Sequence, residues 1–82
     1  MVKNGLYQHF KGGKVFVFGT AKTPEDGVDV LYKGMQNGKI YARPLESFLD
    51  EVIIDEGKTV KRFEHIKERD VDLSFWLDEK ID

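Results

Sequence analysis

The chain has 82 residues, no cysteine and two histidines, and its formal net charge at pH 7 is -2. This length predicts one small domain, and a hydrophobic fraction of 40% is sufficient for its core. No stretch approaches the roughly 18 consecutive apolar residues of a transmembrane helix, and the absence of cysteine excludes disulfides and thiolate metal sites. We therefore expect a soluble cytoplasmic protein that does not contact the membrane.

The first turn signal is Gly12-Gly13, which separates two β-prone segments, residues 6–11 and 14–20. Paired glycines between such segments predict a hairpin. Residues 15–18 are four consecutive apolar side chains, all β-branched or aromatic. This run is typical of a central strand, so we expect both of its faces to be covered.

Two further turns divide the next part of the chain. Residues 23–27 (Thr-Pro-Glu-Asp-Gly) have the composition of a turn in which Gly27 supplies a positive φ angle. A strand is predicted over residues 28–34, and Asn37-Gly38 then predicts a two-residue type I′ turn. The strand that follows covers residues 39–43 and completes a second hairpin.

A short helix is predicted from Pro44 to about Asp50. Proline favours the first helical position, and apolar residues recur at helical spacing on one face: Leu45, Phe48, Leu49, Val52 and Ile53. We expect residues 52–54 and 59–66 to form a last hairpin around the turn at residues 55–58.

Beyond Lys67 the sequence becomes strongly charged, with three basic and six acidic residues in the segment 67–82. This segment also contains an apolar cluster with the chain's single tryptophan: Leu73, Phe75, Trp76 and Leu77. Large apolar side chains are seldom left in water, so we expect the cluster to pack back on the domain or to dock on a partner such as a second copy.

Short strands with local turns and one short helix predict an all-β domain over residues 1–66, built as a small, partly open antiparallel β-barrel. Two motifs then suggest a family. They are Tyr-x-His-Phe-Lys-Gly at residues 7–12 and aromatic-x-Arg-Pro-Leu-Glu at residues 41–46. Together with other landmarks in the same order, they make residues 4–66 resemble the bacterial family called domain of unknown function 1653. The resemblance implies an SH3-like barrel and no established activity.

The chain departs from the usual pattern of that family at three places. The turn Pro24-Glu25-Asp26 stands where the family usually has Ser-Glu-Thr, Ser47 replaces a methionine, and Lys61 replaces a proline. The positions of the two sharpest motifs are retained.

The residues that could carry catalysis or bind a metal do not occur in the motifs that such functions require. His9 and His65 are far apart and lack the spacing of metal ligands, and Gly12-Gly13-Lys14 lacks the spacing of a phosphate-binding loop. The two serines, Ser47 and Ser74, do not lie in a nucleophile motif. We therefore expect neither enzyme activity nor a metal or cofactor, with a small hydrolase using His9 as base as an alternative.

One group of polar and aromatic residues remains. Strand alternation places Tyr7 and His9 on one face, and likewise Tyr41 and Arg43. If these faces meet, they form a shallow groove with two further charged residues, Glu46 and Arg62. Arginine beside aromatic rings recognises carboxylates, phosphates or stacked bases.

The leading hypothesis is a non-catalytic binding module whose ligand-binding residues are Tyr7, His9, Tyr41, Arg43, Glu46 and Arg62. The expected partner is an anionic small molecule or a protein or peptide. The structural alternative is that Arg43 merely pairs with Glu46 while Tyr7 and His9 cover the core. Other hypotheses are a homodimer formed through the apolar cluster of residues 73–77 and, with less support, nucleic-acid binding.

Overall fold

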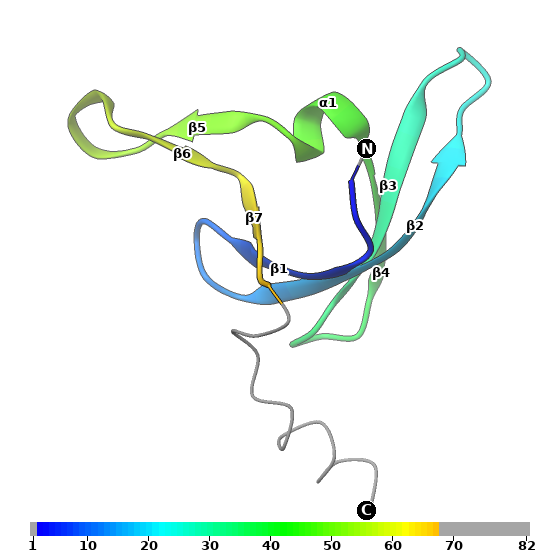
Figure 1. Ribbon diagram of the computed structural model, residues 1–82, viewed down its shortest axis with the longest axis horizontal. Helices are drawn as coiled ribbons and strands as arrows, with labels where there is room; N and C mark the ends of the chain where they lie inside the picture. The colour runs from blue at the N-terminus through cyan, green and yellow to red at the C-terminus, as the bar shows by residue number, and fades with distance from the viewer. Residues whose placement is uncertain (1, 68–82) are drawn as a thin grey trace, which may run out of the picture.

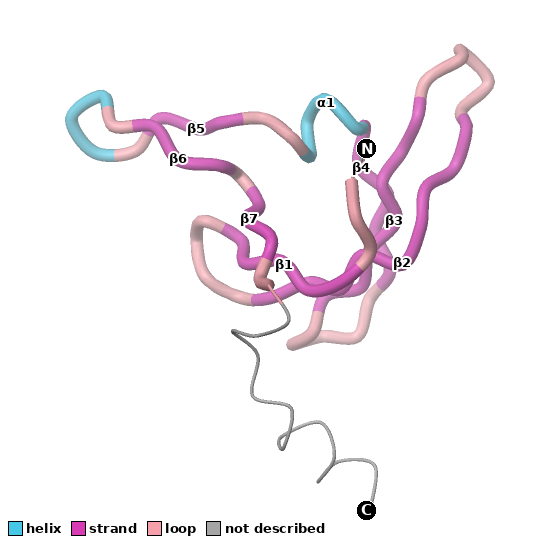
Figure 2. Tube along the Cα trace, in the orientation of Figure 1, coloured by secondary structure: helices cyan, strands magenta, loops and turns pink. Residues whose placement is uncertain are grey.

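The computed structural model describes residues 2–67, and these residues form an all-β domain with one short α-helix and one 3₁₀ turn (Figures 1 and 2). The elements in chain order are β1 (Gly5–His9), β2 (Lys14–Lys22), β3 (Val28–Gly34), β4 (Ile40–Pro44), α1 (Leu45–Phe48), β5 (Glu51–Ile53), η1 (Asp55–Gly57), β6 (Thr59–Lys61) and β7 (Phe63–His65).

Five strands form one antiparallel sheet in the order β4-β3-β2-β1-β7. The sheet curls without closing, so β4 and β7 are its two edges (Figure 1). Strands β5 and β6 pair only with each other and project beyond the sheet as a separate hairpin. The predicted all-β class and partly open antiparallel barrel are therefore confirmed.

The first predicted hairpin is confirmed. Gly12 and Gly13 have φ angles of +100° and +81°, which side chains with a Cβ rarely adopt, and the His9 amide donates to the Gly13 carbonyl at 3.0 Å. The turn at Asn37-Gly38 differs from the predicted type I′ turn. Only Gly38 has a positive φ, and the Gly34 amide donates to the Lys39 carbonyl, so the loop is longer than two residues.

The turn at residues 23–27 is present, but its positive φ angle lies at Asp26 (+64°) and not at Gly27. The Thr23 amide donates to the Gly27 carbonyl at 3.0 Å, and Thr23 Oγ1 accepts a hydrogen bond from the Gly27 amide at 2.9 Å. These bonds close the turn at Gly27, and the left-handed conformation is adopted by the preceding residue.

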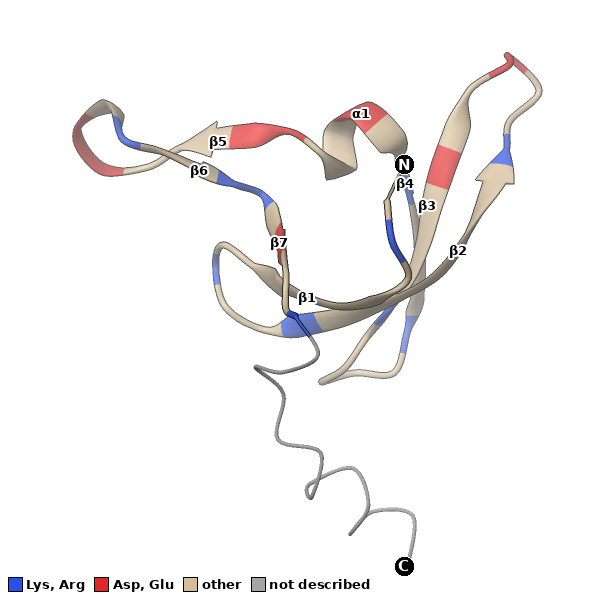
Figure 3. Ribbon diagram, viewed as in Figure 1, with Lys and Arg blue, Asp and Glu red and all other residues tan. Residues whose placement is uncertain are grey.

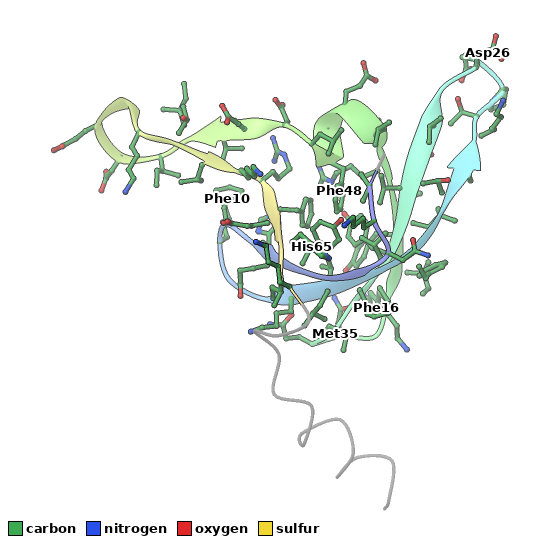
Figure 4. All side chains as sticks on the ribbon, viewed as in Figure 1. Phe10, Phe16, Asp26, Met35, Phe48 and His65 are labelled. Carbon is green, nitrogen blue, oxygen red and sulfur yellow. The ribbon has the colours of Figure 1, made fainter. Side chains whose placement is uncertain are left out.

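The expectation that both faces of β2 are covered is wrong. Val15 and Val17 are buried inside the curve of the sheet, whereas Phe16 and Phe18 are 39% and 44% exposed on the outer side. Figure 4 shows the contrast between Phe16, outside the sheet, and Phe48, inside it. An antiparallel sheet covered on one side accounts for this alternation, even though the sequence of β2 is apolar throughout.

The core lies inside the curved sheet and is rich in aromatic rings. Phe48 of α1 is 1% exposed and stacks on Phe63 with ring centroids 4.3 Å apart. Tyr7 and Tyr32 pack against Phe48 from the sheet at centroid distances of 5.2 and 5.7 Å. The helix therefore fills the open side of the barrel with one large side chain.

The second half of the chain departs from the expected boundaries. The helix ends at Phe48 rather than near Asp50, and the last expected strand is divided into β6 and β7. The break at Arg62 lets β6 pair with β5 while β7 pairs with β1. Hydrogen bonds from the Arg62 amide to the Asp50 carbonyl, and from the Phe10 amide to the Arg62 carbonyl, hold this bend.

The described residues contain no helix of the length and hydrophobicity needed to span a membrane. The apolar cluster of Leu73, Phe75, Trp76 and Leu77 lies outside the described residues, as does almost all of the charged segment 67–82.

Candidate anion-binding groove

A groove of about 250 Å³ opens between the ends of β1, β3 and β4, beside the loops that follow β1 and β3. Among the described residues, its lining includes two basic residues, Lys14 and Arg43, and no carboxylate. Aromatic rings supply much of the remaining wall. Of the six predicted site residues, this groove brings together His9, Tyr41 and Arg43.

Arg43 is held in place by two hydrogen bonds and one aromatic ring. Its Nε donates to the Tyr32 hydroxyl at 3.2 Å, its Nη1 donates to Ser47 Oγ at 2.9 Å, and Cζ lies 5.7 Å from the Phe63 ring centroid. These bonds use two of the five guanidinium N–H groups and leave three for a ligand. A guanidinium fixed in this way is pre-organised to bind an anion.

These bonds also test the structural alternative for Arg43. The guanidinium donates to Tyr32 and Ser47 and not to Glu46, which is exposed in the first turn of α1. Glu46 therefore does not join the groove. Sequence reasoning missed the positioning roles of Tyr32 and Ser47. The role of Ser47 could have been suggested only by its spacing of four residues from Arg43, across the junction of strand and helix.

His9 presents a neutral imidazole. Burial lowers its pKa below the ordinary value, and the positive charges of Arg43, Arg62 and Lys11 lower it further. The Nδ1 atom accepts a hydrogen bond from the Lys11 amide at 3.1 Å, so the proton of the neutral ring must be on Nε2. The ring packs against the edge of Phe63 at a centroid distance of 4.9 Å.

Tyr41 forms an aromatic wall of the groove. Its ring stacks on Tyr32 at a centroid distance of 5.4 Å and an interplanar angle of 24°. Its hydroxyl accepts a hydrogen bond from Asn37 Nδ2 at 2.8 Å, which ties the wall to the loop after β3. A flat ring held on a second ring can stack with a planar ligand group.

Tyr7 lies in the core and does not line the groove, although it shares a strand face with His9. It is 6% exposed, and its hydroxyl donates to the Lys3 carbonyl at 2.7 Å. Burial raises the pKa of the Tyr7 phenol above its ordinary value, and the bond to Lys3 partly offsets this effect. The difference arises because the middle of β1 faces Phe48, whereas its end opens at the groove.

Arg62 is close enough for its charge to act on His9, but its side chain does not line the groove. Its Nε is buried and has no hydrogen-bond partner among residues 2–67. Arg62 therefore adds positive charge near His9.

Between residues 2 and 67, no three side chains of the metal-ligating types His, Asp and Glu lie close enough to hold an ion together.

Comparison with known proteins gives one family and one solved structure. The family model described as "Protein of unknown function (DUF1653)" matches residues 5–65. The crystal structure of a DUF1653 protein from Bordetella bronchiseptica is similar, with a TM-score of 0.70 and 26% sequence identity over 79% of this chain and 87% of that chain. No curated protein matches the chain.

Proposed function

Because this chain belongs to the DUF1653 family, whose function is unknown, we propose its role from its own groove: a non-catalytic module that binds an anionic partner. The observation that carries the proposal is the fixed guanidinium of Arg43, which keeps N–H donors in an aromatic groove to which the part of the chain that the structure describes contributes no carboxylate. Such an arrangement binds a negatively charged ligand group more strongly than a neutral or positively charged one.

The residues of the groove support binding better than catalysis. Between residues 2 and 67, no serine, threonine, aspartate or glutamate is among the residues that line it. Ser47 Oγ already accepts a hydrogen bond from Arg43, and His9 Nδ1 accepts one from the Lys11 amide. A nucleophile paired with a free base, which a hydrolase of this kind would need, is therefore missing from the groove.

An anionic small molecule or a terminal carboxylate of a peptide fits the groove better than a nucleic-acid backbone. Over the described residues, Lys and Arg are spread across several strands and loops with Asp and Glu between them (Figure 3). The net charge of the chain is -2. Binding to a long polyanion usually requires a continuous basic surface.

The test is an amide-resonance map of the labelled protein during titration with pooled anionic metabolites and, separately, with pooled short RNA. We expect the metabolite pool to shift resonances of the loop at residues 12–14 and of residues 41–43. Arg43→Gln should reduce affinity at least tenfold, because the fixed charged donors are lost. Arg43→Lys should recover only part of it, since lysine keeps the charge and loses the planar donor arrangement.

Lys22→Gln is the matched control, because Lys22 is an exposed cation at the far end of β2. It should bind like the parent protein. Resonances of Val17 and Val30 in the core report whether each variant is folded. Equal affinities of the folded Arg43→Gln and Lys22→Gln proteins would refute a ligand-binding role for Arg43.

A further inference from the structure

Two donors of different kinds flank one aromatic ring in the groove. Arg43 Cζ lies 5.7 Å from the Phe63 ring centroid, and the His9 ring lies 4.9 Å from it. Arg43 comes from β4 and His9 from β1, so the two donors reach the groove from opposite halves of the sheet. The Nε2–H of His9, fixed by the bond to Nδ1, is free to donate to a ligand.

This distribution of donors fits a tetrahedral anion better than a carboxylate. A planar carboxylate is best matched by two parallel N–H groups of one guanidinium. In Arg43, Nε donates to Tyr32 and Nη1 donates to Ser47, so the pair of donors that includes Nε is already occupied. The remaining N–H groups of Arg43 and the Nε2–H of His9 come from two different residues, and donors from two residues suit the several oxygens of a phosphate.

The charge around the groove favours a dianion. Among the described residues, Lys14 and Arg43 line the groove without any carboxylate, and the charges of Arg43, Arg62 and Lys11 all act on His9. These three cations come from β4, from the bend between β6 and β7 and from the loop after β1. A phosphate monoester brings close to two negative charges at neutral pH and would offset this excess. A monocarboxylate brings one.

We propose that the groove binds the phosphate of a small phosphate monoester through Arg43 and His9, and that His9 takes up a proton on binding. This inference rests on the anion-binding function proposed above and names its ligand class. The groove, at about 250 Å³, has room for a phosphate with one ring attached to it.

The proton uptake follows from the surroundings of His9. In the free protein, three positive charges oppose protonation of the imidazole. A bound dianion reverses the sign of the local field, so the protonated imidazole becomes the favoured form and donates a charge-assisted hydrogen bond. By linkage, the ligand then binds more tightly as the pH falls toward the pKa of His9 in the complex.

The experiment compares phenyl phosphate with benzoate, because both carry one ring and differ in the anionic head. The imidazole resonances of His9 are followed from pH 4.5 to 8.5, with each ligand and with chloride at matched ionic strength. We expect phenyl phosphate to raise the pKa of His9 by about one unit, equivalent to about tenfold tighter binding by the protonated form. Benzoate should bind more weakly. His65, which does not line the groove, is the internal reference.

Two variants separate the roles of charge and donor. His9→Gln keeps an amide N–H donor without a titratable group, so phenyl phosphate should still bind. After correction for the ionisation of phenyl phosphate itself, the affinity of this variant should no longer increase at low pH. Arg43→Gln should abolish both binding and the shift at His9. The core resonances again show whether each variant is folded.

Three outcomes would overturn the inference. Benzoate binding at least as tightly as phenyl phosphate, dependent on Arg43, would make the ligand a carboxylate and leave the proposed function intact. Binding of phenyl phosphate with no change in the pKa of His9 would remove His9 from the site. No binding of either ligand would also refute the inference. The proposed function would then be tested by the separate titration with pooled metabolites.

Discussion

At the scale of single residues, position along a strand decides what each polar side chain does. Tyr7 and His9 are two residues apart on β1 and point to the same side of the sheet. Tyr7 packs under α1 with its hydroxyl satisfied by Lys3, whereas His9 lies at the end of the strand, where the groove opens. The same alternation therefore yields one core residue and one candidate ligand donor.

His9 also makes the stability of the fold depend on pH. Its pKa is lowered in the folded protein, so the unfolded chain binds the proton more readily. At a pH above the ordinary pKa of about 6.5, this difference does not lower the free energy of unfolding. As the pH falls through about 6.5 toward the lowered pKa of the folded protein, the free energy of unfolding declines. We expect His9→Gln to reduce the decline in urea midpoint between pH 7 and pH 5. An identical decline in the parent and in His9→Gln would contradict the assignment.

At the scale of elements, the turns carry conformational strain that the sequence shows only in part. Asp26 has a φ angle of +64° in the turn between β2 and β3, and Glu56 has +53° within η1. Neither is glycine, although a glycine follows each of them. The first of these turns is closed by two backbone hydrogen bonds and by the bond from the Gly27 amide to Thr23 Oγ1.

Asp26→Gly should stabilise the domain by about 0.5 kcal/mol, because glycine adopts a positive φ without the steric cost borne by a residue with a Cβ. Glu25→Gly is the matched control in the same turn, since Glu25 has no positive φ angle. It should lower the free energy of unfolding by about 0.5 to 1 kcal/mol through the added flexibility of the unfolded chain. Urea unfolding measures both. A loss of stability in Asp26→Gly would show that the aspartate side chain compensates for the strain.

The bend at Arg62 is the other decisive feature at this scale. The segment from Thr59 to His65 alternates like one strand, yet its two halves pair with different partners. The change of partner brings Phe63 back onto the core and leaves Arg62 behind the groove. A local pattern of alternation contains no information about such a change of partner, because pairing depends on segments distant in sequence.

At the scale of the whole molecule, the main sheet and the family match cover the same part of the chain. Within the described residues, the five strands of the main sheet and the buried aromatic side chains lie between residues 5 and 65, which is also the range of the family match. The self-association hypothesis concerns a different part of the chain, the apolar cluster after Lys67, and it stays a prediction.

A chain cut after Lys67 should therefore keep cooperative unfolding and the amide-resonance positions of β1 to β4, because it retains all the core contacts that the described residues make with one another. Light scattering on the full and shortened chains tests self-association in the same experiment. A mass that falls from dimer to monomer on truncation would support the homodimer, and an unchanged monomer would eliminate it. Loss of the folded amide pattern would contradict the claim that residues 2–67 are sufficient.

The sequence alone determined the features that depend on neighbouring residues. The glycine turn after β1, the strands up to residue 43, the helix after Pro44 and the amphipathic position of Phe48 follow from turn chemistry and periodicity. The two motifs of the resembled family lie within the confirmed match. These features could be predicted because backbone conformation and hydrophobic spacing act over a few residues.

Tertiary structure decided what required distant segments to meet. It exposed one face of β2, divided the last strand at Arg62 and gave Arg43 its partners Tyr32 and Ser47 in place of Glu46. It also separated Tyr7 from the groove and kept His9, Tyr41 and Arg43 together. The physical reason is the curvature of the open sheet, which sets the depth of each side chain and which strand ends converge, and which no short stretch of sequence specifies.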